Sequence, residues 1–565
     1  MSSVLRLESS REDLPSAGAV ANPFGDLVRH FFGRFFDAES LSPQGDPAIN
    51  ITQALGILAV PSAFFVLLFR PLTLTGWNLV AVRYMFVSYS MIVMGLLMVF
   101  EWDALFPDRR DYQILTPLPI RLPTLFAAKS VALGIFLAIF LVDINFFGVL
   151  FWPGIDGGSD SLSIIGAHIA AVLAGGLFAA LAVAAIQGLL ITFFSDRTYR
   201  RISICVQTLL MAVLVMLLFL TWLMGFSIQG LVNANSPLLQ YFPGYWFVGF
   251  YESLRPTAHS RILLDLGNTA VRALGCAAGV FVLTYLPGYR RHCRKSVESP
   301  ELPARGGNSS SLLTRLLDRT LLKQSVERAV FHFVSQTITR SVKHRLFLAT
   351  YGGFGAALAV LTFASGKSGL LQLPLTLSFV LVSGLRAAFN FPSELRANWA
   401  FQVSEITGLG GYLAATRKWV VVCAILPLFL LLSPMEFLCF PWKLAMFHLA
   451  FGITLSVLLM EFLLIGFRKV PFTCAHLPGK VNLTFLCTMY VFGFTMYSRI
   501  MASFEAWLGA APLAACLFFV SAASAIVLLA RWRVRMLGGE SVLDYEDPGY
   551  PVILTLDLMP RQSGE

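Results

Sequence analysis

Five polar side chains fall within otherwise apolar runs of the sequence, and they are its candidates for chemistry inside a membrane. They are Asp143, Asn145, Gln187, His448 and Glu461. A carboxylate near the centre of a span costs about 3 kcal/mol on insertion scales, which about five to ten apolar neighbours offset. The functional interpretation is a polar lining of a translocation path or a lock between helices. The alternative is a neutral or paired residue that is satisfied between helices for structural reasons.

A proline-rich stretch precedes one of the apolar runs. It reads ILTPLPIRLPTLFAAK from Ile114 to Lys129 and holds Pro117, Pro119 and Pro123. Proline lacks a backbone donor, fixes its own φ and disfavours helix at the preceding residue, so we expect a stiff, non-helical elbow here. The hypothesis is a handle that a partner protein grips. The alternative is a basic loop whose prolines end one interfacial helix and start the next.

No motif indicates a catalytic, nucleotide or metal site. A P-loop requires G-x-x-x-x-G-K-[ST], and the GKS at Gly366 to Ser368 has Leu361 where the first glycine belongs. The eight cysteines include no C-x-x-C pair and have no histidine at ligand spacing, so neither a zinc site nor a disulfide framework is expected. The acidic and histidine residues expected outside are widely spaced singles: Asp156, Asp160, Glu252, His259, Asp265 and Glu505. We therefore expect no enzyme and no cofactor in this chain.

The composition shows what kind of element must position these residues. The 565-residue chain is 56% hydrophobic and only 13% charged, and its mean hydropathy is +0.72. A soluble protein of this size carries about a quarter charged residues. The sequence therefore predicts an all-α polytopic membrane protein.

A helix-length window finds about twelve apolar runs long enough to cross a bilayer. Their approximate limits are 50–70, 79–101, 124–152, 163–195, 202–229, 265–287, 345–364, 370–390, 419–437, 442–467, 482–500 and 508–530. The N-terminal stretch has no apolar core followed by a cleavage site, so it is not a signal peptide, and we expect both ends of the chain in the cytoplasm.

The distribution of basic residues supports this topology. The segments expected inside hold 34 of the 42 Lys and Arg, because the outside segments hold seven and Arg83 lies in the second span. The net charge of +10 therefore lies beside span ends, where anionic lipid headgroups accept it. We expect membrane lipids as partners and no nucleic acid.

The order of the pieces repeats. The first half consists of an amphipathic stretch at about 24–37, two spans, a loop that opens FPDRR and four more spans. The second half consists of the stretch 325–347, two spans, a loop that opens FPSELR and four more spans. This order predicts two parallel six-helix repeats about an axis along the membrane normal. Gln187 and Glu461, both late in the fourth span of their half, would then lie near each other across that axis.

The repeat divides the chain into five parts. They are a cytoplasmic N-tail with an interfacial helix (1–49), the first six-span half (50–287), a basic linker and connecting helix (288–344), the second half (345–530) and a cytoplasmic C-tail (531–565).

Within this order the chain resembles the permease subunits of type-2 class bacterial ABC exporters. Their loop between the second and third spans often reads L-x-x-L-P-[IV]-x-x-x-x-L-x-x-x-K, and LTPLPIRLPTLFAAK fits it with Leu115, Leu118, Pro119, Ile120 and Lys129. The second-half loop lacks the Leu-Pro-Ile element. The resemblance implies a membrane permease of an ATP-driven exporter in a bacterial-type inner (plasma) membrane, coupled to a separate P-loop ATP-binding subunit, expected in two copies, that holds the ATP and Mg.

The resemblance also assigns residues to the coupling loops. The first loop contributes Phe106, Pro107, Asp108, Arg109, Arg110, Leu115, Pro117, Leu118, Pro119, Ile120, Arg121 and Lys129. The second contributes Phe391, Pro392, Glu394, Arg396, Arg417 and Lys418.

Two other classes stay open. A twelve-span secondary transporter shares the 6+6 layout, and FPDRRD superficially resembles the D-R-x-G-R-R loop of the major facilitator type, although the glycine of that loop is missing. A membrane-embedded, lipid-modifying enzyme would need carboxylate or histidine clusters at the membrane surface. A partner ATPase distinguishes the exporter from both.

Overall fold

The computed structural model describes residues 23–36, 79–102, 122–156, 161–223, 236–255, 261–298, 312–393, 410–465, 469–473 and 483–538, with a few single residues between them. Within these ranges the chain is helical and has no strand. The first-half helices are α1 (Pro23–Phe36), α3 (Leu79–Phe100), α5 (Leu122–Asp156), α6 (Ser161–Phe193), α7 (Asp196–Leu223), η1 (Pro237–Tyr241), α9 (Pro243–Ser253) and α10 (Arg261–Glu298). The helices that follow are α11 (Leu312–Thr320), α12 (Ser325–Arg340), α13 (Val342–Ala364), α14 (Lys367–Ala388), α16 (Gly410–Val420), the π-helical turn η4 (Val421–Ile425), α17 (Leu426–Cys439), α18 (Trp442–Leu463), α19 (Leu483–Ala510) and α20 (Pro512–Gly538).

Ten helices in the described part of the chain are long and apolar enough to cross a membrane, and each corresponds to one of the expected spans. Of the two expected spans that remain, 482–500 is covered by α19, and 50–70 lies almost wholly outside the described residues. The chain is therefore an all-α polytopic membrane protein. The interfacial helix expected at about 24–37 is present as α1, and α10 continues beyond the expected end at 287 to Glu298.

The two halves use the same helix pairings. Five of the helix pairs that pack in the first half have a counterpart in the second, whereas the pairs that involve α9 have none among the described helices. The matching pairs are α1–α5 and α12–α16, α3–α6 and α14–α18, α6–α10 and α18–α20, α3–α7 and α14–α19, and α5–α6 and α17–α18. These five pairings therefore recur in the two halves of the chain.

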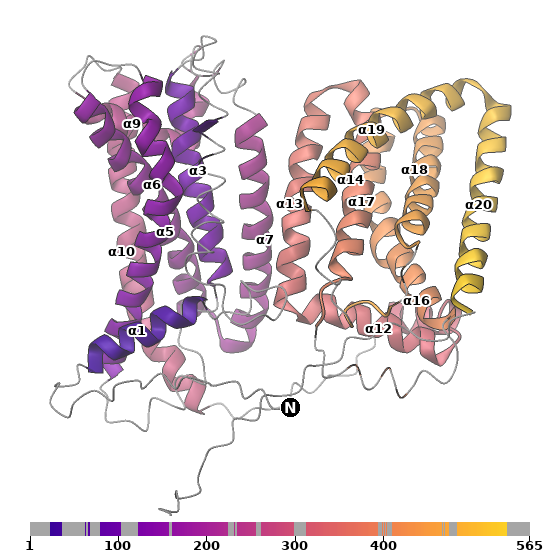
Figure 1. Cartoon of the computed structure of the whole chain (residues 1–565), viewed down its shortest axis with the longest axis horizontal. Helices are drawn as coiled ribbons and strands as arrows, with labels where there is room; N and C mark the ends of the chain where they lie inside the picture. The colour runs from indigo at the N-terminus through magenta and orange to yellow at the C-terminus, as the bar shows by residue number, and fades with distance from the viewer. Residues whose placement is uncertain are drawn as a thin grey trace, which may run out of the picture.

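The two bundles stand side by side and meet at α7 and α13 (Figure 1). Gly353 of α13 allows this close approach, because a Cβ atom there would lie 2.4 Å from the carbonyl oxygen of Ala212 in α7. The rings of Phe219 and Phe354 pack edge to face across the same junction, with centroids 4.8 Å apart.

Both bundles have the same direction. The amphipathic helices α1 and α12 lie at one end, called the basic end here, and α9 lies at the opposite end, called the α9 end (Figure 1). In the first half, η1 and α9 lie between α7 and α10 in the chain, and α9 packs on α3, α6 and α10. In the second half, α19 and α20 are joined through Ala511 alone.

Candidate functional site

The loop residues assigned to coupling fall mostly outside the described ranges. These are residues 106–121 of the first loop, and Glu394 and Arg396 of the second. Phe391 and Pro392 are described and half-buried. The carbonyl oxygen of Phe391 accepts a hydrogen bond from His344 Nε2 at 3.0 Å, and its ring packs on Phe347. The start of the second loop is thereby fixed to α13.

Lys129 joins the first interfacial helix to the third span of its half. It is 5% exposed in α5, and its ammonium lies over the ring of Phe31 in α1, 5.7 Å from the centroid. Leu27 and Phe31 of α1 are buried in the same core as Leu125 of α5. The end of the proline-rich loop is thus attached to a helix that lies across the basic end.

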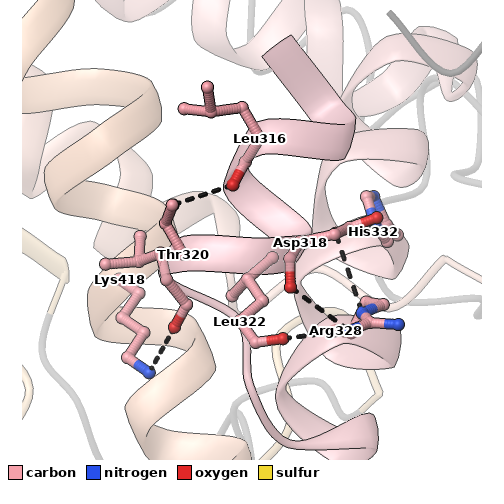
Figure 2. Close-up of polar contacts among 8 residues, drawn as sticks. Leu316, Asp318, Thr320, Leu322, Arg328, His332 and Lys418 are labelled. Carbon is pink, nitrogen blue, oxygen red and sulfur yellow. Dashed lines mark hydrogen bonds and ion pairs between the residues drawn. The ribbon is translucent and has the colours of Figure 1, made fainter. Parts of the chain in front are cut away.

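Lys418 occupies the matching position in the second half, and it joins the third span to the interfacial helix α12 through an ion pair. Its Nζ donates to Glu327 Oε2 of α12 at 2.7 Å and to the carbonyl oxygen of Leu321 at 3.0 Å. Figure 2 shows Lys418 reaching the turn between α11 and α12 from the neighbouring helix. Trp419 adds a bond from its Nε1 to Ser335 Oγ of α12, at 2.7 Å.

The turn between α11 and α12 has its own polar network (Figure 2). His332 Nε2 lies 3.0 Å from Asp318 Oδ1, and Arg328 donates to the carbonyl oxygens of Asp318 and Leu322 at 3.2 and 3.3 Å. These bonds hold two short helices of the basic end as one unit, to which Lys418 then binds. A force on this surface would reach the third span of the second half directly.

Glu461 lies at the basic end of the second bundle between two arginines. It is fully buried, and its carboxylate contacts Arg417 of α16 and Arg533 of α20, the latter at 2.7 Å. Arg533 also donates to the carbonyl oxygen of Glu461 at 2.8 Å. A buried charge needs such partners, and this group of three ties the third, fourth and sixth spans of the half together.

Gln187 lies at the corresponding end of the first bundle and makes neutral contacts. Its Nε2 donates to the carbonyl oxygen of Trp102 at 2.6 Å, and Trp102 donates to Ser203 Oγ at 2.8 Å. Gln187 and Glu461 therefore each bond within their own half, and their contacts do not support the expected meeting of the two across the repeat axis.

Glu101 is the buried charge of this region that sequence reasoning did not single out. It follows the last residue of α3, is 2% exposed, and its Oε1 has no hydrogen-bond partner. Burial raises the pKa of Glu101 from 4.5 to about 7. This carboxyl therefore titrates near neutral pH at the residue from which the proline-rich loop departs.

The two polar residues predicted in the third span point to different surroundings. Asn145 donates to Ser90 Oγ at 2.9 Å and to the carbonyl oxygen of Leu141, while Ser90 donates to the carbonyl oxygen of Val172. Asn145 is thus a helix-helix lock. Asp143 is half-buried, and its Oδ2 has no hydrogen-bond partner.

At the α9 end, the first bundle gathers four charged residues that balance one another. Arg83 of α3 contacts both Asp156 of α5 and Glu252 of α9, and Arg255 lies 3.4 Å from Asp156. The guanidinium of Arg83 also lies over the ring of Tyr251, 4.4 Å from its centroid. The cluster therefore has two positive and two negative groups, nearly closed off from solvent.

The second bundle has a cluster of a different charge at the same end. His448 of α18 contacts Glu505 of α19 through Nδ1, and its Nε2 lies 3.6 Å from Glu436 Oε1 of α17. The three side chains are 0 to 4% exposed. His448 was predicted from the sequence, whereas Glu436 was not.

The expectation that the outer acidic residues are widely spaced singles was wrong for three of them. Asp156 and Glu252 meet at Arg83, and Glu505 meets His448. One feature of the sequence could have indicated these contacts: the charges lie near the ends of apolar runs, and such charges are usually paired. The sequence does not show which of them pair, because the partners are 57 to 169 residues apart.

A cavity of about 450 Å³ opens in the second bundle between α12, α13, α14 and the third span. Its walls are apolar or small, and they include Tyr351, Gly352, Gly384, Trp419 and Leu428. The π-helical turn η4 contributes Cys423 and Ala424 to the wall. Such turns recur at functional sites. The shape and lining suit an apolar chain.

We compared the chain with known proteins. No model of a protein family, no curated protein and no solved structure matches it.

Proposed function

We propose that this chain is the membrane permease subunit of an ATP-driven exporter, with two parallel six-helix halves that form the translocation path. The observation that carries the proposal is the attachment of an interfacial helix to the third span in both halves, through Lys129 in one and Lys418 in the other. Each attachment lies where a loop from the second span enters the third. Two equivalent handles at one end are what a pair of motor subunits would need.

The packing supports movement of one half against the other. Among the described helices, the main contact between the halves is that of α7 with α13, while each half is tied internally by several pairs. Alternating access would then be a rearrangement at this junction, driven from the basic end. In this proposal the basic end is cytoplasmic, both termini lie there, and the membrane is a bacterial-type inner membrane. The apolar cavity beside η4 fits a hydrophobic substrate or the acyl chain of a lipid.

The test is co-purification from the native membrane. The tagged wild-type chain is expected to bring down a P-loop ATPase, and the double variant Pro119→Ala/Arg121→Glu is expected to lose it, because the stiff elbow and its charge form the grip. Arg396→Glu, measured alone, shows whether the second loop also couples. Lys443→Glu is the matched control, since this lysine is exposed at the α9 end, beside Trp442.

Two outcomes contradict the proposal. One is the absence of any ATPase after chemical cross-linking of the wild-type protein. The other is loss of the ATPase in Lys443→Glu to the same extent as in the loop variant, which would indicate a general effect of charge reversal.

A twelve-span secondary transporter is the second candidate, and one observation favours it. Glu436, His448 and Glu505 form a buried ionisable cluster within the helices, of the kind that marks ion or proton pathways. The structure gives less support to a lipid-modifying enzyme, because the charged clusters at the α9 end are closed off from solvent.

A further inference from the structure

The cluster of Glu436, His448 and Glu505 has more buried acceptors than donors. His448 touches Glu505 through Nδ1, but both carboxylate oxygens of Glu436, Oε2 of Glu505 and Nε2 of His448 lack hydrogen-bond partners in the described structure. Glu436 and His448 are completely buried, and Glu505 is 4% exposed. Buried polar groups without partners are rare and costly, so this arrangement needs a physical explanation.

Within the described part of the chain, no Lys or Arg pairs with either carboxylate. Among the described residues, their ion-pair partner is His448 alone. In α14 the run 369–385 contains neither Lys nor Arg, and the first basic residue of α20 is Arg531, at the basic end. Lys443 of α18 and Arg499 of α19 are exposed. The remaining titratable group on these faces is Tyr497, whose buried hydroxyl has no hydrogen-bond partner.

The charges do not add up to neutrality without an added proton. With His448 as an imidazolium and both glutamates ionised, the cluster carries one net negative charge in an apolar site. Removing an ion from water is so costly that an uncompensated buried carboxylate binds a proton instead. Within the described part of the chain, no group of three His, Cys, Asp or Glu side chains has a geometry that could hold a metal ion.

We propose that Glu436, His448 and Glu505 form a proton-binding site at the α9 end of the second half, in which Glu436 takes up the proton that makes the cluster neutral. Glu505 is paired with His448, whereas Glu436 is 3.6 Å away from it and has two free oxygens, so Glu436 is the group that carries the extra proton. The three side chains come from α17, α18 and α19. Binding of the proton therefore holds these helix ends together, and its release leaves a buried negative charge that drives them apart.

The first half differs from this site in the source of its positive charge. There, at the same end, Arg83 and Arg255 supply two fixed positive charges to Asp156 and Glu252. A fixed charge does not depend on pH, whereas a bound proton does. The inference requires no ATPase partner, so it stands or falls independently of the exporter proposal.

The test follows protonated carboxyl groups by infrared difference spectroscopy on the full-length protein in lipid nanodiscs. It uses a Glu101→Gln background, because burial raises the pKa of Glu101 to about 7 and its carboxyl would contribute to the same band. Between about pH 5 and about pH 9, where exposed carboxyls are ionised throughout, the parent is expected to lose a band of buried, protonated carboxyl as pH rises. Glu436→Gln is expected to lack this band, and Glu505→Gln to shift its midpoint. Glu461→Gln is the matched control, because two arginines already balance Glu461, and its band change is expected to equal that of the parent.

Melting temperature gives a second reading, and its first part needs only the parent protein. If the native state binds a proton that the unfolded chain releases, the melting temperature of the parent falls as pH rises across this range. Glu436→Gln, which resembles the protonated form, removes that fall. An unchanged band in Glu436→Gln overturns the proposal, as does a melting temperature of the parent that does not fall.

Discussion

The two halves share a helix arrangement but compensate their buried charges in opposite ways. At the α9 end the first half pairs its acids with Arg83 and Arg255, while in the second half His448 is the one partner that the described residues supply to the two glutamates. At the basic end the roles are exchanged, because Glu461 of the second half has two arginines and Glu101 of the first half has an oxygen with no partner. Helix packing is thus the common feature of the repeat, and charge compensation is what differs.

The less compensated charges lie at the basic end of the first half and at the α9 end of the second half. If the proposed proton site is present, each half has one end whose charges are balanced by arginine and one end whose charge depends on a proton, and these two proton-dependent ends lie at opposite ends of the bundles.

The largest effect is expected at Arg83. Arg83→Gln leaves Asp156 and Glu252 buried without their shared partner, and breaking such an arrangement costs about 3 to 5 kcal/mol of unfolding free energy. The acids then take up protons, so the stability of the variant falls as pH rises, as proposed for the second half. Unfolding in detergent at several pH values measures both effects.

Arg255→Gln is the control for this prediction. Arg255 lies 3.4 Å from Asp156 and is more exposed than Arg83, so its loss costs about 1 kcal/mol and adds little pH dependence. Equal losses in the two variants, or an Arg83→Gln protein whose stability is independent of pH, would show that Arg83 is not the central compensating charge.

A smaller and purely pH-dependent effect is expected at Glu101. Burial raises the pKa of Glu101 from 4.5 to about 7, so the folded protein holds a proton that the unfolded chain has released over this interval. This contribution to stability is complete below pH 4.5 and is lost as pH rises through about 7, at about 1.4 kcal/mol per pH unit. Glu101→Gln is expected to remove this slope, as read from unfolding midpoints between pH 5 and pH 8, with Glu461→Gln keeping the wild-type slope.

What could be predicted from the sequence was local. The approximate limits of α3 and α5 follow from long apolar runs, and α1 follows from the helical spacing of Leu27 and Phe31. The repeated order of elements predicted two six-helix halves, and five helix pairs recur between them. The third span of the second half begins at Gly411 instead of the expected 419, because Arg417 and Lys418 lower the local hydropathy although both are paired in the fold.

What could not be predicted was the choice of partners. Arg83 was recognised as a charge within a span, but Glu252 lies 169 residues away on a short helix. Such pairs depend on how each helix is rotated in its bundle, and a single sequence gives the period of a helix without that rotation. Gln187 and Glu461 show the same limit, because their equivalent positions in the repeat say nothing of which helix each faces.

The smallest effect is expected where the halves agree, at the attachments of the interfacial helices. Lys418→Met removes bonds to Glu327 and to the carbonyl oxygen of Leu321, and because the side chain is 32% exposed, the expected cost is at most about 1 kcal/mol. The more sensitive measurement for Lys418→Met is local hydrogen exchange, which is expected to rise across the turn between α11 and α12. Lys323→Met, in the same turn, is the control. Lys129→Met is expected to raise exchange in α1 instead, because that lysine lies over Phe31. If Lys418→Met left the hydrogen exchange of its turn unchanged, the ion pair of Lys418 would not stabilise the turn between α11 and α12. Lys129 and Lys418 would then occupy equivalent positions in the two halves but have different roles.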